Sequence, residues 1–405
     1  MEWEYFVQEE NKSIIRLSKQ TFYTYDTKIR EDLRGLKDGK IAMTSNFGKH
    51  RGREALEKNF LFWNKSDVIF PSGQEPIELD IYDENIGNMS MDKQKDVALD
   101  FYHQLERGCE CQDVAVEVAK SIVTKKYRNS KGVTFTYNKS IIRANAQVSF
   151  WVNGEKETIV EKKVFTHLDV NQLLKNCVKE KQMYLESCGS AKVRMKEPYG
   201  CVLQGQALVG IFMPLRKFLR SKKGMVFNPL VSILDSSLET GMENSFPYDD
   251  EGIKGQKTEL VKDGQVIQTI FDLQKAGKIG VQSTGNGIRS MEKKALLPRY
   301  SNMIMKEGDE SLSEVINGIG NGLLINRIAG NGINNYSDGR FVLIVEEGFV
   351  ISNGKIAGSA KNTVLEGNVI DVLGGISMKL GNKRSYVGSG IYAPFLYTEA
   401  IKCKY

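Results

Sequence analysis

The sequence predicts an α+β protein of two domains: an N-terminal α/β domain with strands and helices at residues 1–190, and a C-terminal antiparallel, β-rich, barrel-like domain at residues 191–405. Three observations carry this prediction. The chain of 405 residues is 41% hydrophobic, which is enough to bury more than one core. Its first half alternates strand-like with helix-like patterns. Its second half repeats short apolar runs between turn signals, as hairpin-rich β domains do.

The first predicted elements are strands within residues 4–47 and two helices, at residues 53–63 and 92–107. An Asp38-Gly39 pair introduces the last of these strands and favours a type I′ turn. In the second helix apolar residues recur at one-turn spacing and form a stripe of Val97, Ala98, Phe101, Tyr102 and Leu105. A packed core helix explains this stripe without any function.

The clearest strand prediction covers residues 141–152, where apolar and polar side chains alternate until Asn153-Gly154 turns the chain back. A helix is expected next, with Asp169 as its N-cap and its end near Ser187. The predicted domain boundary follows directly, at residues 188–190.

Turn signals and glycine-rich pieces divide the second half of the chain. Hairpin turns are predicted at three dipeptides: Asp263-Gly264, Glu347-Gly348 and Asn353-Gly354. Three glycine-dense pieces invite comparison with phosphate-binding loops: 285–287, 318–322 and 330–332. None precedes a Gly-Lys-Ser/Thr sequence or has the strand, turn and helix of a dinucleotide fingerprint, so tight turns and bulges are favoured.

Charge and cysteine content limit the partners. The chain has 56 Lys and Arg against 50 Asp and Glu, and its basic clusters are interpreted as solvated faces, so nucleic acid is not an expected partner. An acidic N-terminal stretch and the lack of an apolar run of ~20 residues predict a cytoplasmic protein without a membrane partner. The six cysteines are expected to be reduced, since only Cys109 and Cys111 are close together.

Three consecutive carboxylates, Asp249, Asp250 and Glu251, stand between Pro247 and Gly252. Neighbouring acids can supply acid/base catalysis or hold a metal. A structural turn is the favoured interpretation, because aspartates accept backbone N–H bonds in turns. The alternative is a peptide-binding cleft, to which five further residues could belong: Ser283, Thr284, Gly285, Asn286 and Arg289.

The C-terminal half also contains an ordered series of longer motifs. They are VSILDSS at 231–237, SFPYDDEG at 245–252 with its continuation to 272, STGNGIR at 283–289, PRYSNMIMKEGDESLSEVI at 298–316 and LEGNVIDVL at 365–373. This series resembles the TldD/PmbA family, peptidase-related proteins also called modulators of DNA gyrase. The resemblance implies two kinds of subunit. The TldD kind binds zinc through an HExxxH-type motif, whereas the TldE/PmbA kind lacks this motif and associates with the first.

The segment that corresponds to the zinc-binding helix is residues 204–224, and the chain has no His, Asp or Glu from Pro198 to Leu234. An HExxxH motif needs two histidines on one helix to reach the same metal and a Glu to activate the metal-bound water. Neither is available here. The histidines of the chain are interpreted as structural residues: His50, His103 and His167.

The resemblance therefore implies a metal-free TldE/PmbA-like subunit with no catalytic or metal-binding residue. Its expected partners are a TldD-like zinc peptidase subunit, which holds the zinc, and an unfolded or leader peptide; homodimerisation of the isolated chain stays open. One alternative is a stand-alone metallohydrolase with Asp249, Asp250 and Cys403 as ligands, although Cys403 lacks the glycines that surround the late cysteine of the TldD kind. Another is a regulatory protein that acts on DNA gyrase or DNA.

Overall fold

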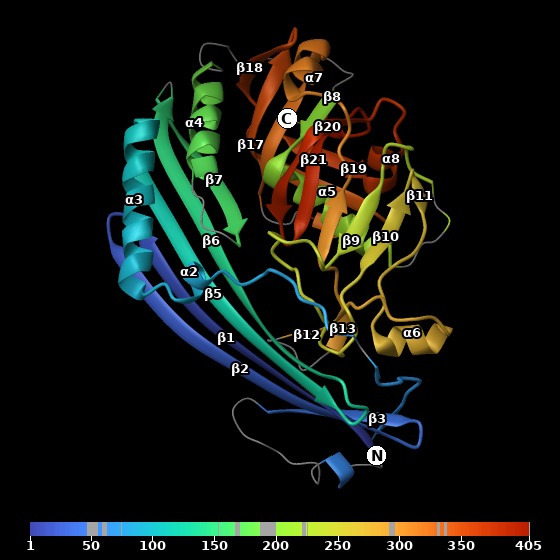
Figure 1. Ribbon diagram of the computed structural model, residues 1–405. Helices are drawn as coiled ribbons and strands as arrows, with labels where there is room; N and C mark the ends of the chain where they lie inside the picture. Colours follow the sequence, from blue (N-terminus) through green and yellow to red (C-terminus); the bar gives the residue numbers. More distant parts are fainter. Residues whose placement is uncertain are drawn as a thin grey trace.

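The chain has a mixed α+β architecture with two bodies side by side, as the computed structural model shows (Figure 1). The structure describes all residues except 47–55, 59–62, 74, 153, 167–170, 187–199, 221–223, 225, 291–295, 330–332, 336–337 and 405. The predicted domain boundary at residues 188–190 lies outside the described residues. So do the predicted turn residue Asn153, the predicted N-cap Asp169 and most of the predicted helix at 53–63.

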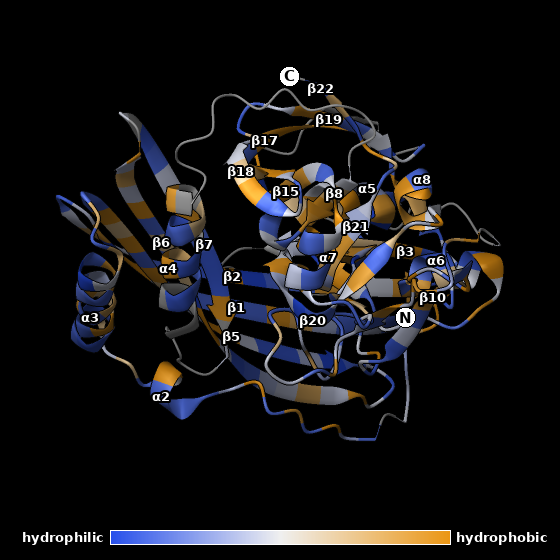
Figure 2. Cartoon of the chain, turned by 90° about the horizontal axis from the view of Figure 1, so that it is seen from above, coloured by the Kyte–Doolittle hydropathy of each residue, from blue (hydrophilic) through white to orange (hydrophobic). Residues whose placement is uncertain are grey.

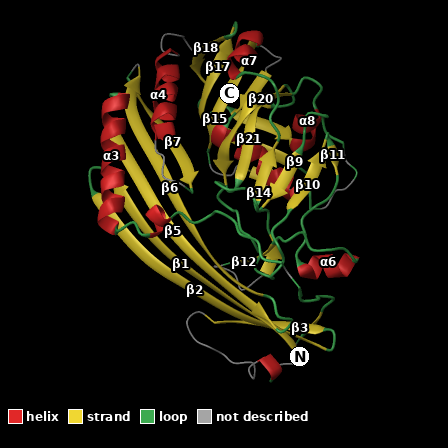
Figure 3. Cartoon of the chain, viewed as in Figure 1, coloured by secondary structure: helices red, strands yellow, loops and turns green. Residues whose placement is uncertain are grey.

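The N-terminal body is a seven-stranded sheet in the order β4-β3-β2-β1-β5-β6-β7. Its strands are β1 (Glu2–Leu17), β2 (Thr21–Lys37), β3 (Lys40–Asn46), β4 (Asn64–Lys65), β5 (Asp113–Asn129), β6 (Thr134–Val152) and β7 (Glu155–Phe165). Every pairing between these described strands is antiparallel, so this body has meanders where an α/β domain has parallel strands. Its long strands curve around the C-terminal body (Figure 3).

Helices cover one end of this sheet. They are α2 (Glu84–Gly87), α3 (Met91–Cys109) and α4 (Asn171–Glu186). The helix α3 confirms the prediction at residues 92–107. The hydroxyl of Ser90 caps it by accepting a hydrogen bond from the backbone N–H of Lys93 (3.1 Å). The apolar stripe is buried at Ala98, Phe101 and Leu105 and packs in one cluster with the sheet.

The predicted strand at residues 141–152 forms the second half of β6. Ala144, Ala146 and Val148 are fully buried, whereas Gln147 is exposed, as the alternating pattern requires. Figure 2 shows the same alternation of hydrophilic and hydrophobic residues along the neighbouring strands β1 and β5. The predicted turn at Asp38-Gly39 is confirmed by positive φ angles of 48° and 68° between β2 and β3.

The C-terminal body is built on a 13-stranded sheet with the main path β11-β10-β9-β14-β21-β8-β15-β17-β19-β22. Its strands are β8 (Gly200–Leu203), β9 (Ile233–Ser236), β10 (Lys257–Lys262), β11 (Gln265–Val266), β14 (Asn302–Met305), β15 (Asn321–Ile328), β16 (Ile333–Asn335), β17 (Arg340–Ser352), β18 (Lys355–Ser359), β19 (Val364–Asn368), β20 (Lys379–Gly388), β21 (Ile391–Thr398) and β22 (Lys402–Lys404). A separate hairpin pairs β12 (Gly287–Arg289) with β13 (Leu296–Pro298). The helices are α5 (Val209–Phe218), α6 (Leu273–Ile279), α7 (Leu312–Gly318) and α8 (Val369–Gly374), and a 3-10 turn at Gly205–Leu208 precedes α5.

Most of these pairings are antiparallel, as predicted, but β14 pairs with β21 and β15 with β8 in parallel. The main path of described strands ends at β11 and β22, so the barrel-like shape is not confirmed. The predicted turns at Asp263-Gly264 and Asn353-Gly354 are confirmed by positive φ angles. The turn predicted at Glu347-Gly348 is wrong, because both residues lie inside β17. A glycine is needed there since a Cβ at Gly348 would lie 2.9 Å from the carbonyl oxygen of Leu324.

The core of the C-terminal body forms around α5. Ile211, Phe212, Leu215 and Phe218 are buried in one cluster with the sheet. This packing fixes which face of α5 remains for polar contacts, namely the face that carries Arg216. Among the described helices, none has both the length and the apolar composition that a membrane crossing requires.

Candidate functional site

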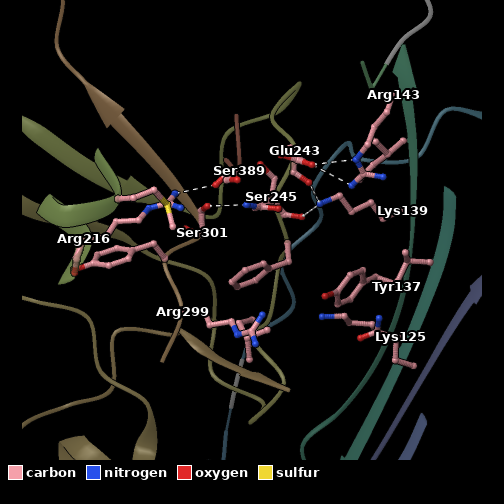
Figure 4. Close-up of a pocket in the computed structure, with 18 of the residues that line it drawn as sticks. Lys125, Tyr137, Lys139, Arg143, Arg216, Glu243, Ser245, Arg299, Ser301 and Ser389 are labelled. Atoms are coloured by element: carbon pink, nitrogen blue, oxygen red, sulfur yellow. Dashed lines mark hydrogen bonds and ion pairs between the residues drawn. The ribbon is translucent and has the colours of Figure 1, made fainter. Parts of the chain in front are cut away.

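A pocket of about 650 Å³ lies between the N-terminal sheet and α5 (Figure 4). The sheet side is formed by β5 and β6, which contribute Val123, Lys125, Tyr137, Lys139, Ile141 and Arg143. The other side is formed by Met213, Arg216 and Lys217 of α5 and by Arg220, two residues beyond the end of this helix. Loops of the C-terminal body close the space with Glu243, Asn244, Ser245, Phe246, Arg299, Tyr300, Ser301 and Ser389.

The pocket lining is strongly cationic. Its described residues include seven cations, Lys125, Lys139, Arg143, Arg216, Lys217, Arg220 and Arg299, against the single carboxylate Glu243. Arg143 pairs with Glu243 (Nη2 to Oε1, 3.0 Å), and Lys125 pairs with Asp250 behind the lining (Nζ to Oδ1, 2.6 Å). A surplus of positive charge therefore remains, and it favours an anionic ligand.

Lys139 is the most deeply placed cation of the lining. Its Nζ donates to the carbonyl oxygens of Glu243 and Ser245, the latter at 2.9 Å. Burial lowers the pKa of Lys139 to about 7; the charges of Lys125 and Arg143 act in the same direction, and Glu243 opposes them. The protonation state of this amine is therefore sensitive to any charge that enters the pocket.

Arg216 faces the pocket from α5, on the opposite side from Arg143 (Figure 4). Its Nη2 donates a hydrogen bond to the carbonyl oxygen of Ser389 (2.9 Å), and the guanidinium lies over the ring of Tyr300 (5.7 Å to the centroid). Its buried Nε has no hydrogen-bond partner among the described residues. Burial lowers the pKa of Arg216, against the opposing influence of Asp235. The guanidinium is thus oriented but incompletely bonded.

The first acid of the predicted site, Asp249, holds its own loop together. One carboxylate oxygen accepts hydrogen bonds from the backbone N–H groups of Glu251 and Ile253, both at 2.9 Å. The other oxygen accepts from the N–H of Gly287 at the same distance. Burial raises the pKa of Asp249, and the neighbouring Glu251 raises it further. This is the geometry of an aspartate that fixes a turn.

Asp250 and Glu251 are fully buried and point at basic side chains of the N-terminal sheet. Asp250 accepts from Lys125 and from the backbone N–H of Arg289 (2.7 Å). Glu251 accepts from Arg34 (2.7 Å) and from a backbone N–H in α6. Burial raises the pKa of Glu251, although Arg34 opposes the shift. These two acids therefore connect the two bodies.

Arg289 completes this connection from β12. It donates to Asp32 (2.9 Å), to a carboxylate oxygen of Glu4, and to the carbonyl oxygen of Asp250 (3.1 Å). Its guanidinium also lies over the ring of Phe6, 4.9 Å from the centroid. We call the connected set the buried charge network; it consists of Glu4, Arg30, Asp32, Arg34, Lys125, Asp250, Glu251 and Arg289.

The remaining predicted site residues form a second hydrogen-bonded group. Ser283 and Thr284 bond to the backbone of Phe271, and the hydroxyl of Thr284 lies 2.6 Å from the amide oxygen of Asn286. Asn286 donates to Asp235 (2.8 Å). Gly285 has a φ of +68°, which favours glycine.

The structure therefore brings the predicted residues together but behind the pocket. None of the eight, Asp249, Asp250, Glu251, Ser283, Thr284, Gly285, Asn286 and Arg289, belongs to the pocket lining. They are connected to it through Lys125, which bonds to Asp250, and through Ser301, whose hydroxyl donates to Asp235 (2.9 Å). The sequence analysis named none of the lining cations as site residues, because it interpreted the basic clusters that contain Lys125, Arg216, Lys217 and Arg220 as solvated faces. The other three, Lys139, Arg143 and Arg299, belong to no such cluster.

The residues proposed as ligands of a stand-alone hydrolase are not gathered into one cluster. Cys403 lies on β22 with its Sγ 3.6 Å from that of Cys201, whereas Asp249 is bonded in its own loop and Asp250 is bonded to Lys125. Within the described part of the chain, no three His, Cys, Asp or Glu side chains are grouped as metal ligands. His103 is exposed beside Glu106; His50 and His167 lie outside the described residues.

Comparison with known proteins shows which solved structures share this fold. Two solved structures share the fold: a putative modulator of a DNA gyrase from Thermotoga maritima (TM-score 0.86, 21% identity, covering 100% of this chain and 96% of the other) and TldE from Thermococcus kodakarensis (TM-score 0.87, 18% identity, 99% and 96%). At these identities the likeness establishes the fold.

Sequence relatives make the assignment specific. Residues 215–404 match the PmbA/TldA metallopeptidase C-terminal domain. A metalloprotease TldD homolog of Buchnera aphidicola is 32% identical over 166 residues, which are 41% of this chain and 34% of that protein. A zinc metalloprotease TldD homolog of Saccharolobus solfataricus is 28% identical over 233 residues, 53% of this chain and 50% of that protein. The chain thus spans between a third and a half of these curated relatives. The family match thus assigns residues 215–404 to the PmbA/TldA metallopeptidase C-terminal domain, and the two curated relatives are TldD homologues.

Proposed function

We propose that this chain is the non-catalytic, TldE/PmbA-like subunit of a heteromeric TldD/TldE zinc peptidase. The complex degrades unfolded peptides or removes the leader from ribosomally made modified peptides. The observation that supports this proposal is the character of α5, which is one wall of the pocket. Where the TldD kind carries its zinc motif, this helix contributes Met213, Arg216 and Lys217 to the lining.

These side chains do not fit a zinc ion. Zinc in proteins is bound by imidazole, thiolate or carboxylate groups, and its bound water needs a nearby base. The segment from Pro198 to Leu234 has no His, Asp or Glu. Arg216 and Lys217 add positive charge to this wall, which repels a cation. In the proposal, the partner therefore supplies the zinc and the base.

The contribution of this chain is one half of a peptide chamber. The pocket has the volume of a typical ligand site, and it is lined by both charged and apolar residues. The network behind it holds the N-terminal sheet against the C-terminal body, which keeps the pocket walls at a fixed spacing. A closed chamber of this kind admits an extended chain, whose backbone can be bound by hydrogen bonds.

The test is co-purification of this chain with a TldD-like protein that carries an HExxxH motif, followed by zinc analysis. Cleavage of an unstructured peptide is then measured with each protein alone and with the mixture. We expect only the mixture to cut efficiently and the zinc to remain with the partner. A matched control replaces the Glu of the partner's motif by Gln, which should abolish cleavage without loss of the complex.

Two outcomes contradict the proposal. The first is stoichiometric metal in this chain together with cleavage in the absence of any partner. The second is a mixture that forms no complex and cuts no faster than the partner alone. Binding of duplex DNA that weakens steeply with salt would instead support the regulatory alternative.

A further inference from the structure

We propose that the cationic pocket between β5, β6 and α5 is a binding site for a carboxylate group of the peptide. The ligand is either the free α-carboxylate at the peptide C-terminus or the side chain of an Asp or Glu within it. That the ligand is a peptide follows from the proposed function, on which this part of the inference rests. The charge and the geometry of the pocket are independent of that function, so the site can be tested in the isolated chain.

The charges of the lining support this proposal first. Four of its cations have no carboxylate within 4 Å among the described residues: Lys139, Arg216, Arg220 and Arg299. Glu243 cannot neutralise them, because its carboxylate is occupied by Arg143, by the hydroxyl of Tyr386 (2.8 Å) and by the backbone N–H of Gly390 (3.1 Å). Among the described residues of the lining, no carboxylate is therefore left to pair with these four cations.

Two guanidinium groups of the lining are oriented by the protein and can bind the proposed carboxylate. Arg216 and Arg220 both lie over the ring of Tyr300, each 5.7 Å from the centroid. Each is anchored by an Nη2 that donates to a backbone carbonyl: Arg216 to Ser389 and Arg220 to Pro298 (3.1 Å). Since a guanidinium has five N–H donors, others remain for a ligand. A planar fork of donors matches a carboxylate in a bidentate arrangement.

Arg299 supplies a third guanidinium on a fixed backbone. Its backbone N–H donates to the carbonyl oxygen of Asn286, and its own carbonyl accepts from the amide of that residue, both at 3.0 Å. The exposed side chain makes no hydrogen bond or ion pair with the described residues. Figure 4 shows it between the sheet wall and the α5 wall. From this position the Arg299 side chain can contact a bound anion without a change in its backbone conformation.

The pocket favours a carboxylate on an organic chain over a bare inorganic anion. Apolar side chains share the lining with the cations: Val123, Ile141, Met213, Phe246 and Ile288. They can contact the aliphatic part of a peptide beside its carboxylate. An inorganic phosphate would leave this apolar surface uncovered, so it should compete only weakly.

The experiment measures peptide binding to the isolated full chain by calorimetry. Three probes are compared: acetyl-penta-alanine with a free C-terminus, the same peptide as its C-terminal amide, and the amide with a central Glu. We expect the free acid or the Glu peptide, whichever is the natural source of the carboxylate, to bind about 10- to 100-fold more tightly than the amide, as charge-assisted hydrogen bonds do. Inorganic phosphate serves as competitor.

Variants connect the binding to named residues. Arg299→Gln should weaken binding of the preferred acid about tenfold without affecting folding, because its side chain is exposed and makes no hydrogen bond or ion pair with the described residues. Arg216→Gln should weaken it further, and Arg216→Lys should restore part of the affinity. Arg340→Gln, at a surface arginine of β17 outside the lining, is the matched control and should bind as the wild type does.

Equal affinity for the acid, the Glu peptide and the amide would overturn the inference, as would unchanged binding in both Arg→Gln variants. Displacement by phosphate at equal concentration would overturn it as well, since the site would then be a general anion site. These failures can be distinguished from failure of the proposed function. A mixture that cuts the free acid, the Glu peptide and the amide equally well overturns the pocket assignment alone. A mixture that does not cut, beside a chain that binds the acid selectively, contradicts the proposed function alone.

Discussion

Replacement of Arg289 by Met tests whether the buried charge network holds the two bodies together. Methionine has a similar length but no charge, so the variant leaves Glu4 and Asp32 without one of their cations. Removal of one member of a buried ion pair typically costs about 3–5 kcal/mol. Arg34 still contacts Glu4 (2.7 Å) and Arg30 still contacts Asp32 (2.7 Å), so neither acid loses all compensation. We therefore expect the lower end, about 3 kcal/mol of lost unfolding free energy.

The assay is urea unfolding of the purified chain at neutral pH, followed by circular dichroism. Arg340→Met is the matched control, because Arg340 pairs with Asp338 on an exposed surface and should matter little. A loss below about 1 kcal/mol in Arg289→Met would refute the reasoning, since two buried carboxylates that have each lost one of their cations should cost more than that.

The pH dependence gives an independent check of the same variant. Burial tends to raise the pKa of Asp32, but Arg289 and Arg30 outweigh it and the pKa is lowered below the ordinary value of 3.8. In the wild type, the stability from this carboxylate is present above that ordinary value and is lost as the pH falls through the lower folded pKa. Without Arg289 the pKa rises, and protonation at mildly acidic pH relieves the buried charge. The destabilisation should therefore shrink as the pH falls, and a constant difference would contradict this account.

Three further predictions concern single sites. Gly252→Ala should lower the unfolding free energy by about 2–4 kcal/mol, because φ is +83° and the new Cβ would lie 2.5 Å from Cε1 of Tyr127. Gly132→Ala is the control, since φ is +87° but the space around the new Cβ is open. In thermal melting it should show only the cost of the strained backbone, about 1 kcal/mol. Since the pKa of Lys139 is lowered to about 7, the folded state loses this proton before the unfolded state does, and wild-type stability should rise by roughly 2–3 kcal/mol between pH 7 and about 9. In urea unfolding, the stability of Lys139→Met should not rise in this way. An equal increase of stability with pH in the variant and the wild type would contradict the lowered pKa of Lys139. Ser90→Ala should cost about 1 kcal/mol through loss of the N-cap of α3, and an unchanged urea midpoint would argue against the cap.

Local chemistry explains which predictions the structure confirms. The helix α3, the strand at residues 141–152 and the turn at Asp263-Gly264 each depend on periodicity or φ preferences within a few residues. The failed turn at Glu347-Gly348 likewise pairs an acidic residue with a glycine, but there the glycine serves a close approach of two strands rather than a reversal. A dipeptide cannot distinguish these two uses.

The sequence by itself determined the family motifs, the carboxylate triplet and the lack of zinc-binding residues on α5, because each is a property of adjacent residues. Only the tertiary structure decided what the triplet contacts. Asp250 and Glu251 meet Lys125 and Arg34, which lie more than a hundred positions earlier in the chain. The cationic pocket arises in the same way, from strands and a helix far apart in sequence. Long-range pairing of this kind depends on which surfaces fold against one another, and no local pattern of residue types encodes it.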